Sequence, residues 1–392
     1  MRVLLSTIGS RGDVQPLVAL ALQLKSLGQE VRLSVPPDFR EWIESLGIPV
    51  TPIGPEVRKA AVSTPSMVSF VANQFETLAA AAQGCNIIVA ATALQIAARS
   101  VAEKMGIPYV FAAYCPTVLP SPHHAPPPLP PLPGQTAEPA TADNRELWAR
   151  NAERFNGTFG TALNSSRASA GLTPVNDVRT HMFTDRPWLA ADPTLAPWPD
   201  PTDQAVFQTG AWILPDERPL SPELEAFLET GAPPVYFGFG SARAPQDLSQ
   251  VMIQTARALG RRAILSRGWA DLSLVDNAPD CLAIGEVNVQ ALFKRVAAIV
   301  HHGGAGTTTA AALAGTPQVV IPQVYDQHYW AQRIHHLGIG TAHASGAPTT
   351  DSLTSALEHA LQPDVVALAR SIATRVRSDG AQAAARRLIS GA

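Results

Sequence analysis

The chain has 392 residues, of which 46% are hydrophobic and 16% charged, and its formal net charge is −3. This composition predicts a globular protein with two domains and argues against a disordered chain. Because there is no basic block and no apolar stretch of membrane-spanning length, we expect no nucleic acid binding and no stable membrane insertion. The three scattered cysteines favour reduced thiols, a cytoplasmic location and no metal site.

Strands and helices alternate through the first half of the chain. Strands are expected at residues 2–6, 31–35, 86–91, 108–113 and 188–191, and helices at residues 14–27 and 93–105. Repeated strand–helix units predict a parallel sheet with helices on both faces.

The same alternation returns in the second half. Strands are expected at residues 235–239, 263–266, 281–284, 297–300 and 318–321, with helices at 223–228, 248–259, 289–296 and 307–314 and more helix after residue 351. A segment rich in proline and charge separates the halves. We therefore expect an N-terminal domain over residues 1–209, a linker over 210–222, and a C-terminal domain with terminal helices over 223–392.

The most informative segment is a glycine-rich turn at residues 299–308. An apolar strand ends in His301 and His302, and three glycines within the next four residues lead into a helix of small residues. Free N–H groups at a helix start favour an anion, and missing side chains let a diphosphate come close. A histidine beside the turn can add a hydrogen bond or a positive charge. The segment therefore predicts a site for a nucleotide diphosphate.

Asp13 is the leading catalytic candidate. It follows a Gly-Ser-Arg-Gly turn at the carboxyl end of the first strand, where ligands of such sheets bind. A second interpretation stays open, because aspartate is also a favoured N-cap for a helix that begins at Val14. The glycine spacing differs from the dinucleotide fingerprint, which disfavours a nicotinamide-dependent oxidoreductase.

Polar residues also follow strands of the second half. Asp326 and Gln327 offer hydrogen-bonding groups to sugar hydroxyls, or else Asp326 caps the next helix. Ser241 is either a diphosphate contact or part of an ordinary loop. Arg267 and Trp269 are candidates for stacking on a nucleotide base, or else an exposed arginine and a half-buried tryptophan.

Residues 116–139 have an unusual composition, with nine prolines between Pro116 and Pro133. This pattern predicts an extended loop. The loop is either a plain surface loop or a substrate-facing one, because it directly follows the strand at 108–113. In the second interpretation, Leu129 and Leu132 cover an aromatic acceptor.

Together these motifs resemble the GT-B glycosyltransferases, and within them the glycopeptide-antibiotic glycosyltransferases of the vancomycin group. The resemblance covers the whole chain and is closest to members that glucosylate the 4-hydroxyphenylglycine of the aglycone. It is carried by residues 9–13, 184–192, 208–219, 266–271, 285–288, 301–308 and 326–327.

The resemblance implies two Rossmann-like, doubly wound parallel-sheet domains that face each other across a cleft. It implies transfer, with inversion, of glucose or a deoxysugar from a UDP- or TDP-sugar to a hydroxyl of a small-molecule or peptide aglycone. We expect no metal or other cofactor, and a monomer. A polyketide, sterol or flavonoid acceptor stays open, as do a sugar-nucleotide epimerase of the same fold and a non-catalytic binding protein.

The resemblance also assigns site residues by position. Asp13 matches the base that deprotonates the acceptor, and Val287 matches the residue whose backbone pairs with the nucleotide base. Ser10 and Ser241 match residues near the donor phosphates, and Asp326 and Gln327 match sugar contacts. The diphosphate turn comprises His301, Gly303, Gly304, Gly306 and Thr307. The proline-rich segment matches an acceptor loop, and its predicted contacts are Pro122, His123, Leu129 and Leu132.

Overall fold

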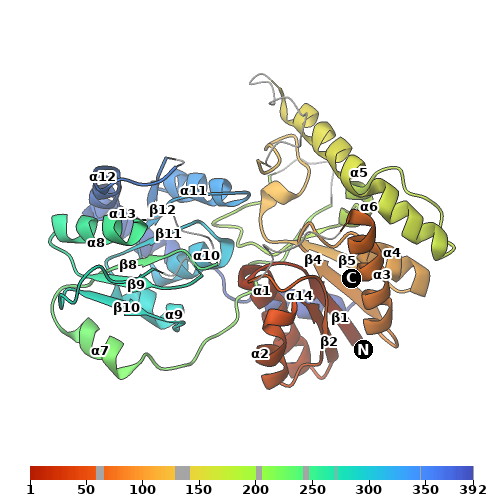
Figure 1. Cartoon of the computed structure of the whole chain (residues 1–392), viewed down its shortest axis with the longest axis horizontal. Helices are drawn as coiled ribbons and strands as arrows, with labels where there is room; N and C mark the ends of the chain where they lie inside the picture. Colours follow the sequence, from red (N-terminus) through yellow and green to blue (C-terminus); the bar gives the residue numbers. More distant parts are fainter. Residues whose placement is uncertain are drawn as a thin grey trace. The chain divides into compact units, whose positions relative to one another are not determined.

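The computed structural model describes residues 1–58, 66–128, 142–199, 205–241, 247–269, 272–344 and 346–391. The chain divides into two compact units (Figure 1). Unit 1 comprises Met1–Pro126, Pro130–Leu214 and Arg377–Ala392, and unit 2 comprises Pro127–Leu129 and Pro215–Val376. Within the described ranges, no helix combines the length and apolarity needed to cross a membrane.

Unit 1 is built on a seven-stranded parallel sheet in the order β3-β2-β1-β4-β5-β6-β7. The strands are β1 (Arg2–Thr7), β2 (Glu30–Val35), β3 (Val50–Pro52), β4 (Ile87–Ala91), β5 (Tyr109–Ala113), β6 (Trp188–Leu189) and β7 (Phe207–Gln208). The strand order reverses between β1 and β4. In such sheets, ligands bind at the carboxyl ends of the two strands where the order reverses.

The helices of unit 1 cover this sheet. They are α1 (Arg11–Ser26), α2 (Arg40–Ser45), α3 (Met67–Ala81), α4 (Ala98–Met105), α5 (Asn144–Ser169), α6 (Val178–Phe183) and α14 (Gly380–Ile389). Helix α1 buries Leu17, Leu20 and Leu24 completely, and these residues recur every three or four positions. Full burial of one such side chain contributes roughly 1.5–3 kcal/mol.

Helix α14 belongs to unit 1, although the sequence predicts residues 223–392 as one C-terminal domain. It packs against α1, and it buries Ala381, Ala384, Ala385 and Leu388. Just before it, the backbone N–H of Arg377 donates to Asp192 Oδ2 at 2.8 Å. The assignment of the last residues to the second domain is therefore wrong, because apolar periodicity predicts that a helix packs but not on which sheet.

Unit 2 is built on a six-stranded parallel sheet in the order β10-β9-β8-β11-β12-β13, which reverses between β8 and β11. The strands are β8 (Val235–Gly238), β9 (Ala263–Ser266), β10 (Cys281–Ile284), β11 (Ala298–His301), β12 (Gln318–Val320) and β13 (Gly340–Ala342). The helices are α7 (Pro222–Glu229), α8 (Leu248–Ala258), α9 (Val289–Leu292), α10 (Ala305–Ala314), α11 (Gln327–His336), α12 (Thr350–Ala360) and α13 (Pro363–Ala373).

Both faces of the unit 2 sheet are covered. Phe237 and Val300 lie in one apolar cluster with residues of α8 and α12. Their neighbours Tyr236 and Ile299 lie in another, with residues of α7 and α9. Adjacent strand residues point to opposite faces, so a sheet buried on both sides reads as a continuous apolar run.

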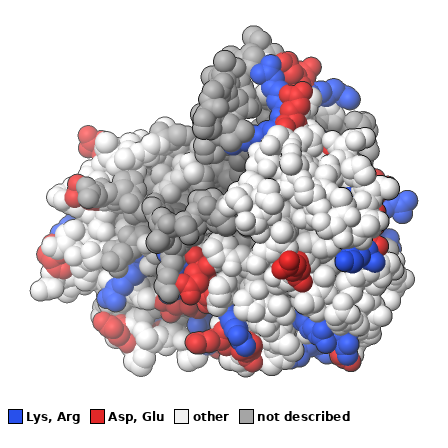
Figure 2. Space-filling view, turned by 45° about the vertical axis from the view of Figure 1, so that its right-hand side comes forward, with Lys and Arg blue, Asp and Glu red and all other residues white. Residues whose placement is uncertain are grey.

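The predicted class of two doubly wound parallel sheets is confirmed. The units divide between Leu214 and Pro215, within the segment expected as a linker. On the face shown in Figure 2, charged side chains lie in small groups of both signs.

Candidate active site

Asp13 lies where the strand order of unit 1 reverses, at the start of α1. This helix begins at Arg11 with Ser10 as its N-cap, so Asp13 is its third residue and not the N-cap that the sequence predicts. Its Oδ2 accepts hydrogen bonds from the backbone N–H of Ser10 at 2.6 Å and from the Ser10 hydroxyl at 3.1 Å. The side chain therefore does stabilise the helix start, but from the third position, as in a capping box.

The surroundings of Asp13 change its acidity. Desolvation raises its pKa to about 6, and the hydrogen bonds from Ser10 oppose this shift. A carboxyl group with this pKa is ionised at neutral pH and accepts a proton more readily than an ordinary aspartate.

Two neighbours hold Asp13 in place. A Cβ on Gly9 would lie 2.2 Å from Asp13 Oδ2, so only glycine lets the carboxylate fold back over the turn. The hydroxyl of Tyr114, just after β5, donates to the backbone carbonyl of Asp13 at 3.1 Å. The turn after β1 is thereby tied to the end of β5.

The glycine-rich turn of unit 2 lies where its strand order reverses, between β8 and β11. Gly304 is the N-cap of α10, which begins at Ala305, two residues earlier than the sequence predicts. Thr308 is the first residue whose N–H reaches a helical carbonyl, that of Gly304 at 3.0 Å. No described residue accepts from the N–H groups of Ala305, Gly306 and Thr307. Free N–H groups at a helix start are suited to bind an anion.

His301 does not have the predicted role at this turn. It is completely buried, its Nδ1 accepts the N–H of Gly303 at 3.0 Å, and its Nε2 lies 2.9 Å from Gln318 Oε1. Burial lowers its pKa to about 3, with His302 adding to the effect. With both ring nitrogens occupied and the ring neutral, His301 shapes the turn from inside and offers no positive charge to a ligand.

His302 is the histidine that lies beside the start of α10, and it was not among the predicted site residues. The position that a Cβ of Gly304 would take lies 2.6 Å from His302 Nε2, and that of Gly240 lies 3.3 Å from its Cε1. Its Nδ1 is buried and has no hydrogen-bond partner among the described residues. Burial lowers its pKa to about 4, so the ring is neutral at pH 7. Consecutive residues at a strand end point to opposite sides of the sheet, so the sequence could have indicated that the two histidines have different surroundings.

Four further predicted donor contacts follow strands of the same sheet. Ser241 follows β8, and the backbone N–H of Trp269, after β9, donates to the carbonyl of Gly240 at 2.7 Å. Arg267 is exposed, and Val287, after β10, packs on the core. Because carboxyl ends of parallel strands share one edge, these residues lie at the edge that carries the glycine-rich turn.

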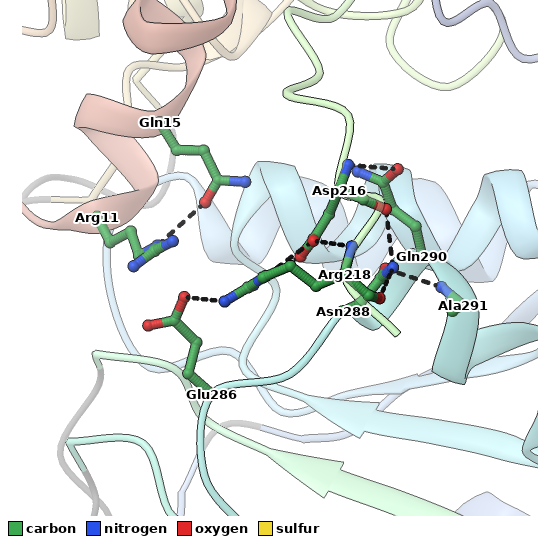
Figure 3. A network of polar contacts seen from close by, with 8 residues as sticks. All are labelled: Arg11, Gln15, Asp216, Arg218, Glu286, Asn288, Gln290 and Ala291. Carbon is green, nitrogen blue, oxygen red and sulfur yellow. Dashed lines mark hydrogen bonds and ion pairs between the residues drawn. The ribbon is translucent and has the colours of Figure 1, made fainter. Parts of the chain in front are cut away.

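The loop that carries Val287 is fixed by a polar network (Figure 3). Arg218 bonds Asp216 Oδ1 at 2.8 Å and Glu286 Oε1 at 3.3 Å. Asn288 Nδ2 donates to the carbonyls of Asp216 at 2.7 Å and Arg218 at 2.9 Å. The residues on both sides of Val287 are therefore held to the segment before α7, which positions the Val287 backbone.

Asp326 and Gln327 lie between β12 and α11. Asp326 is at the N-cap position of α11, but its Oδ2 accepts the indole N–H of Trp330 at 3.2 Å and no backbone group of the first turn. Gln327 Oε1 accepts the N–H groups of Gln323 at 2.9 Å and Val324 at 3.1 Å. Tyr325 has a φ of 57°, and such strain in a residue with a side chain is characteristic of functional loops.

The described part of the proline-rich segment is anchored to α5. Trp148 donates its indole N–H to the carbonyl of His124, and Asn144 donates to that of Pro122, both at 2.8 Å. The His124 ring meets Trp148 and Trp198 edge-on. A plain surface loop with few buried contacts is therefore the wrong description of this part.

The predicted acceptor contacts divide here into two groups. Pro122 and His123 lie in the anchored part, where His123 is exposed. Leu129 and Leu132 lie outside the described residues. Among the described residues, no group of three or more His, Cys, Asp or Glu side chains is placed to hold a metal ion.

Comparison with known proteins adds a sequence relationship along both units. Residues 3–121 match the model "Glycosyltransferase family 28 N-terminal domain", and residues 251–386 match "Erythromycin biosynthesis protein CIII-like, C-terminal domain". The vancomycin aglycone glucosyltransferase of Amycolatopsis orientalis is 51% identical over 99% of this chain and 97% of its own length. The dTDP-epi-vancosaminyltransferase of the same organism is 46% identical over 95% of this chain and 93% of its own.

Solved structures share the fold over the whole chain. The glycotransferase of kitacinnamycin has a TM-score of 0.74 at 19% identity and covers 99% of this chain and 98% of its own. Glycosyltransferase VinC in complex with DTDP has a TM-score of 0.71 at 20% identity, and the match covers 100% of this chain and 99% of the VinC chain.

Proposed function

Because this chain belongs to the glycosyltransferase family that includes the vancomycin aglycone glucosyltransferase, and has its two-domain GT-B fold, we propose that its acceptor is a glycopeptide aglycone. The donor is a UDP- or TDP-sugar that carries glucose or a deoxysugar. The acceptor class rests on full-length identities of 46–53% to glycosyltransferases that include enzymes named for vancomycin aglycone and epi-vancosamine.

The proposed reaction is a one-step displacement at the sugar C1. The acceptor oxygen bonds to C1 from the side opposite the diphosphate, its proton passes to Asp13, and the bond from C1 to the diphosphate oxygen breaks. One displacement inverts the configuration at C1, and no enzyme-bound sugar forms. The observation that carries this mechanism is the position of the half-buried Asp13 carboxyl after β1, where Ser10 holds its Oδ2 and the pKa is raised to about 6.

The departing diphosphate gains negative charge, and the start of α10 is suited to bind it. Unpaired N–H groups at Ala305, Gly306 and Thr307 are preorganised donors, and the dipole of α10 favours an anion there. We assign His302 as a further neutral donor, in place of His301.

The remaining donor contacts are assigned by their place along the sheet edge. Val287 pairs with the nucleotide base through a backbone that the Asn288 network holds in place. Arg267 and Trp269 lie beside that base, and Ser241 beside the diphosphate. Ser10 belongs instead with Asp13, because its hydroxyl donates to the carboxylate.

Asp326 and Gln327 are the proposed contacts of the donor sugar. Gln327 uses its amide oxygen to fix the loop before α11, and Trp330 orients the Asp326 carboxylate. On the acceptor side we keep Pro122, His123, Leu129 and Leu132 as contacts. No metal takes part in the mechanism, so turnover should be unchanged by EDTA.

The proposal is tested by mass spectrometry of products from a grid of donors and acceptors. Donors are UDP-glucose, TDP-glucose and a TDP-deoxysugar. Acceptors are a glycopeptide aglycone, a macrolide aglycone, a sterol and a flavonoid. We expect one added sugar on the glycopeptide aglycone. A product only with another acceptor would reject the acceptor class, and an isomerised donor without acceptor would identify an epimerase.

A further inference from the structure

Unit 1 contains a cavity at the amino ends of its strands, whereas Asp13 lies at their carboxyl ends. Its volume is about 930 Å³, and its lining includes Tyr109, Trp188 and Phe207, the first residues of β5, β6 and β7. Asp13 follows the carboxyl end of β1. In a parallel sheet, the amino ends of the strands lie on one side and their carboxyl ends on the other. This cavity is therefore separate from the site around Asp13. Its volume is within the range of small-molecule sites, roughly 300–1,000 Å³.

Positive charge exceeds negative charge in the lining. Four arginines line the cavity, namely Arg99, Arg167, Arg186 and Arg387, against two carboxylates, Glu103 and Asp185. Arg167 is paired with Glu103 at 2.7 Å. Arg186 and Arg387 are exposed, and neither has an ion-pair partner among the described residues. His181 also lines the cavity, but burial and nearby arginines lower its pKa to about 4, so it stays neutral.

The cavity also has an aromatic wall and an unused hydrogen-bond donor. The rings of Trp188 and Phe207 meet edge-on with centroids 5.4 Å apart, and the Arg387 guanidinium lies 5.4 Å from the Phe207 ring. Phe207 is 38% exposed, so its ring is accessible to a ligand in the cavity. The Tyr109 hydroxyl is buried and has no hydrogen-bond partner among the described residues. A buried hydroxyl without a partner is costly, and a bound oxyanion would satisfy it.

We propose that this cavity binds a small aromatic anion, separately from the donor and acceptor of the transferase. The ring of the ligand packs on Phe207 and Trp188, and its carboxylate or sulfonate meets Arg186 and Arg387. Arginine is suited to both contacts, because its planar group stacks on rings and bonds oxyanions through two N–H groups. Neither the proposed sugar donor nor the aglycone enters into this inference.

The test is isothermal titration of the full-length protein with naphthalene-2-sulfonate, and with 2-naphthol as an uncharged analogue. We expect one site with a Kd of about 0.1 mM or tighter for the sulfonate, and binding at least roughly tenfold weaker for 2-naphthol. The double variant Arg186→Gln/Arg387→Gln should weaken sulfonate binding at least about tenfold. Both arginines are exposed, so the melting temperature should stay the same.

Arg386→Gln is the matched control, because Arg386 is an exposed arginine of the same helix outside the cavity lining. Its Kd should equal that of the parent protein. Saturating TDP should leave the sulfonate Kd unchanged, since the cavity lies within unit 1. The inference is overturned by absence of binding, by equal Kd values for the double variant and the parent, by equal affinity for 2-naphthol, or by displacement with TDP.

Discussion

Each unit has a helix start beside the point where its strand order reverses, and the two starts differ in their third residue. Helix α1 follows β1 and α10 follows β11, which lie on opposite sides of that point, and both helices have glycine as the second residue, Gly12 in α1 and Gly306 in α10. The third residue is Asp13 in α1 and Thr307 in α10. In α1 the carboxylate folds back and accepts the Ser10 N–H, so the helix start is closed to an anion. In α10 the same region stays open.

One architecture therefore places a carboxylate at the helix start in unit 1 and free N–H groups at the helix start in unit 2. The fold provides the position, and the third residue of the helix decides its charge.

Asp13→Asn keeps a hydrogen-bond acceptor at the start of α1 and removes the base. General-base catalysis is worth roughly 10²–10⁴-fold, so we expect kcat to fall by about two orders of magnitude or more, with donor affinity unchanged. The melting temperature should not fall, because burial disfavours the ionised carboxylate at neutral pH. Near-normal kcat would leave Asp13 with a structural role alone, and Asp326 would then be tested.

Thr307→Asp gives α10 the third residue of α1. A carboxylate about 4 Å from a diphosphate charge costs about 4 kcal/mol at an effective dielectric constant near 20, and water screens part of this, so donor Kd should rise at least about 100-fold. Thr307→Ser is the control and should change donor Kd little. Calorimetry with TDP measures both. Unchanged affinity in the aspartate variant would place the diphosphate elsewhere.

Gly304→Val tests the close approach at the same turn. A Cβ at this position would lie 2.6 Å from His302 Nε2, so the imidazole must move and the new side chain fills the path of the diphosphate. We expect donor KM to rise at least about tenfold, or turnover to be lost, with acceptor binding unchanged. Donor affinity that calorimetry finds intact would contradict the site.

Ser10→Ala tests the pKa of Asp13, and as the loss of an N-cap it should also cost about 1 kcal/mol of stability. The Ser10 hydroxyl favours the ionised carboxylate, so its loss raises the pKa above the value of about 6. Because protonated Asp13 cannot accept a proton, kcat/KM of the parent protein falls as the pH falls through the pKa of Asp13. In Ser10→Ala, this acidic limb of the pH profile should move to higher pH. Activity at pH 8 should change far less than at pH 6. If the acidic limb did not move, the pH profile would not report the titration of Asp13. The control Ser10→Thr keeps a hydroxyl and should restore the pH profile of the parent protein.

Trp148→Phe has the smallest expected effect and concerns the acceptor segment. It removes the hydrogen bond to the His124 carbonyl and keeps most of the ring contact. We expect unit 1 to lose about 1 kcal/mol of stability, which lowers the melting temperature by roughly 2–4 °C in a domain of this size. Acceptor KM should rise while donor KM stays constant. A rise in donor KM instead would remove this segment from the acceptor site.

Strands were the most predictable part of the fold. The apolar runs of β1, β8 and β11 are visible in the sequence because both faces of each sheet are buried. The sequence reasoning missed α3 and α5. Helix α5 is 26 residues long but buries only four of them, so its apolar signal is weak. The two-residue strand β7 has too short a pattern to recognise.

The candidate site was predictable where a residue's place in the chain decides its role. Asp13 and the turn at Gly303–Gly306 follow strands at the points where the order reverses. The sequence does not say which of His301 and His302 lies inside the core. That difference depends on which ring the packed core encloses. The packing of α14 on unit 1 depends on a long-range contact that no local pattern encodes.

The return of α14 to unit 1 has a consequence for synthesis of the protein. On the ribosome, residues 215–376 are made before residues 377–392, so unit 2 has all of its chain while unit 1 still lacks one helix. The face of α1 that α14 covers stays exposed to chaperones and proteases during that interval. Completion of unit 1 therefore requires that translation has passed α14, and a ribosome stalled just after residue 376 leaves an unfinished unit 1 attached to a unit 2 that has all of its chain.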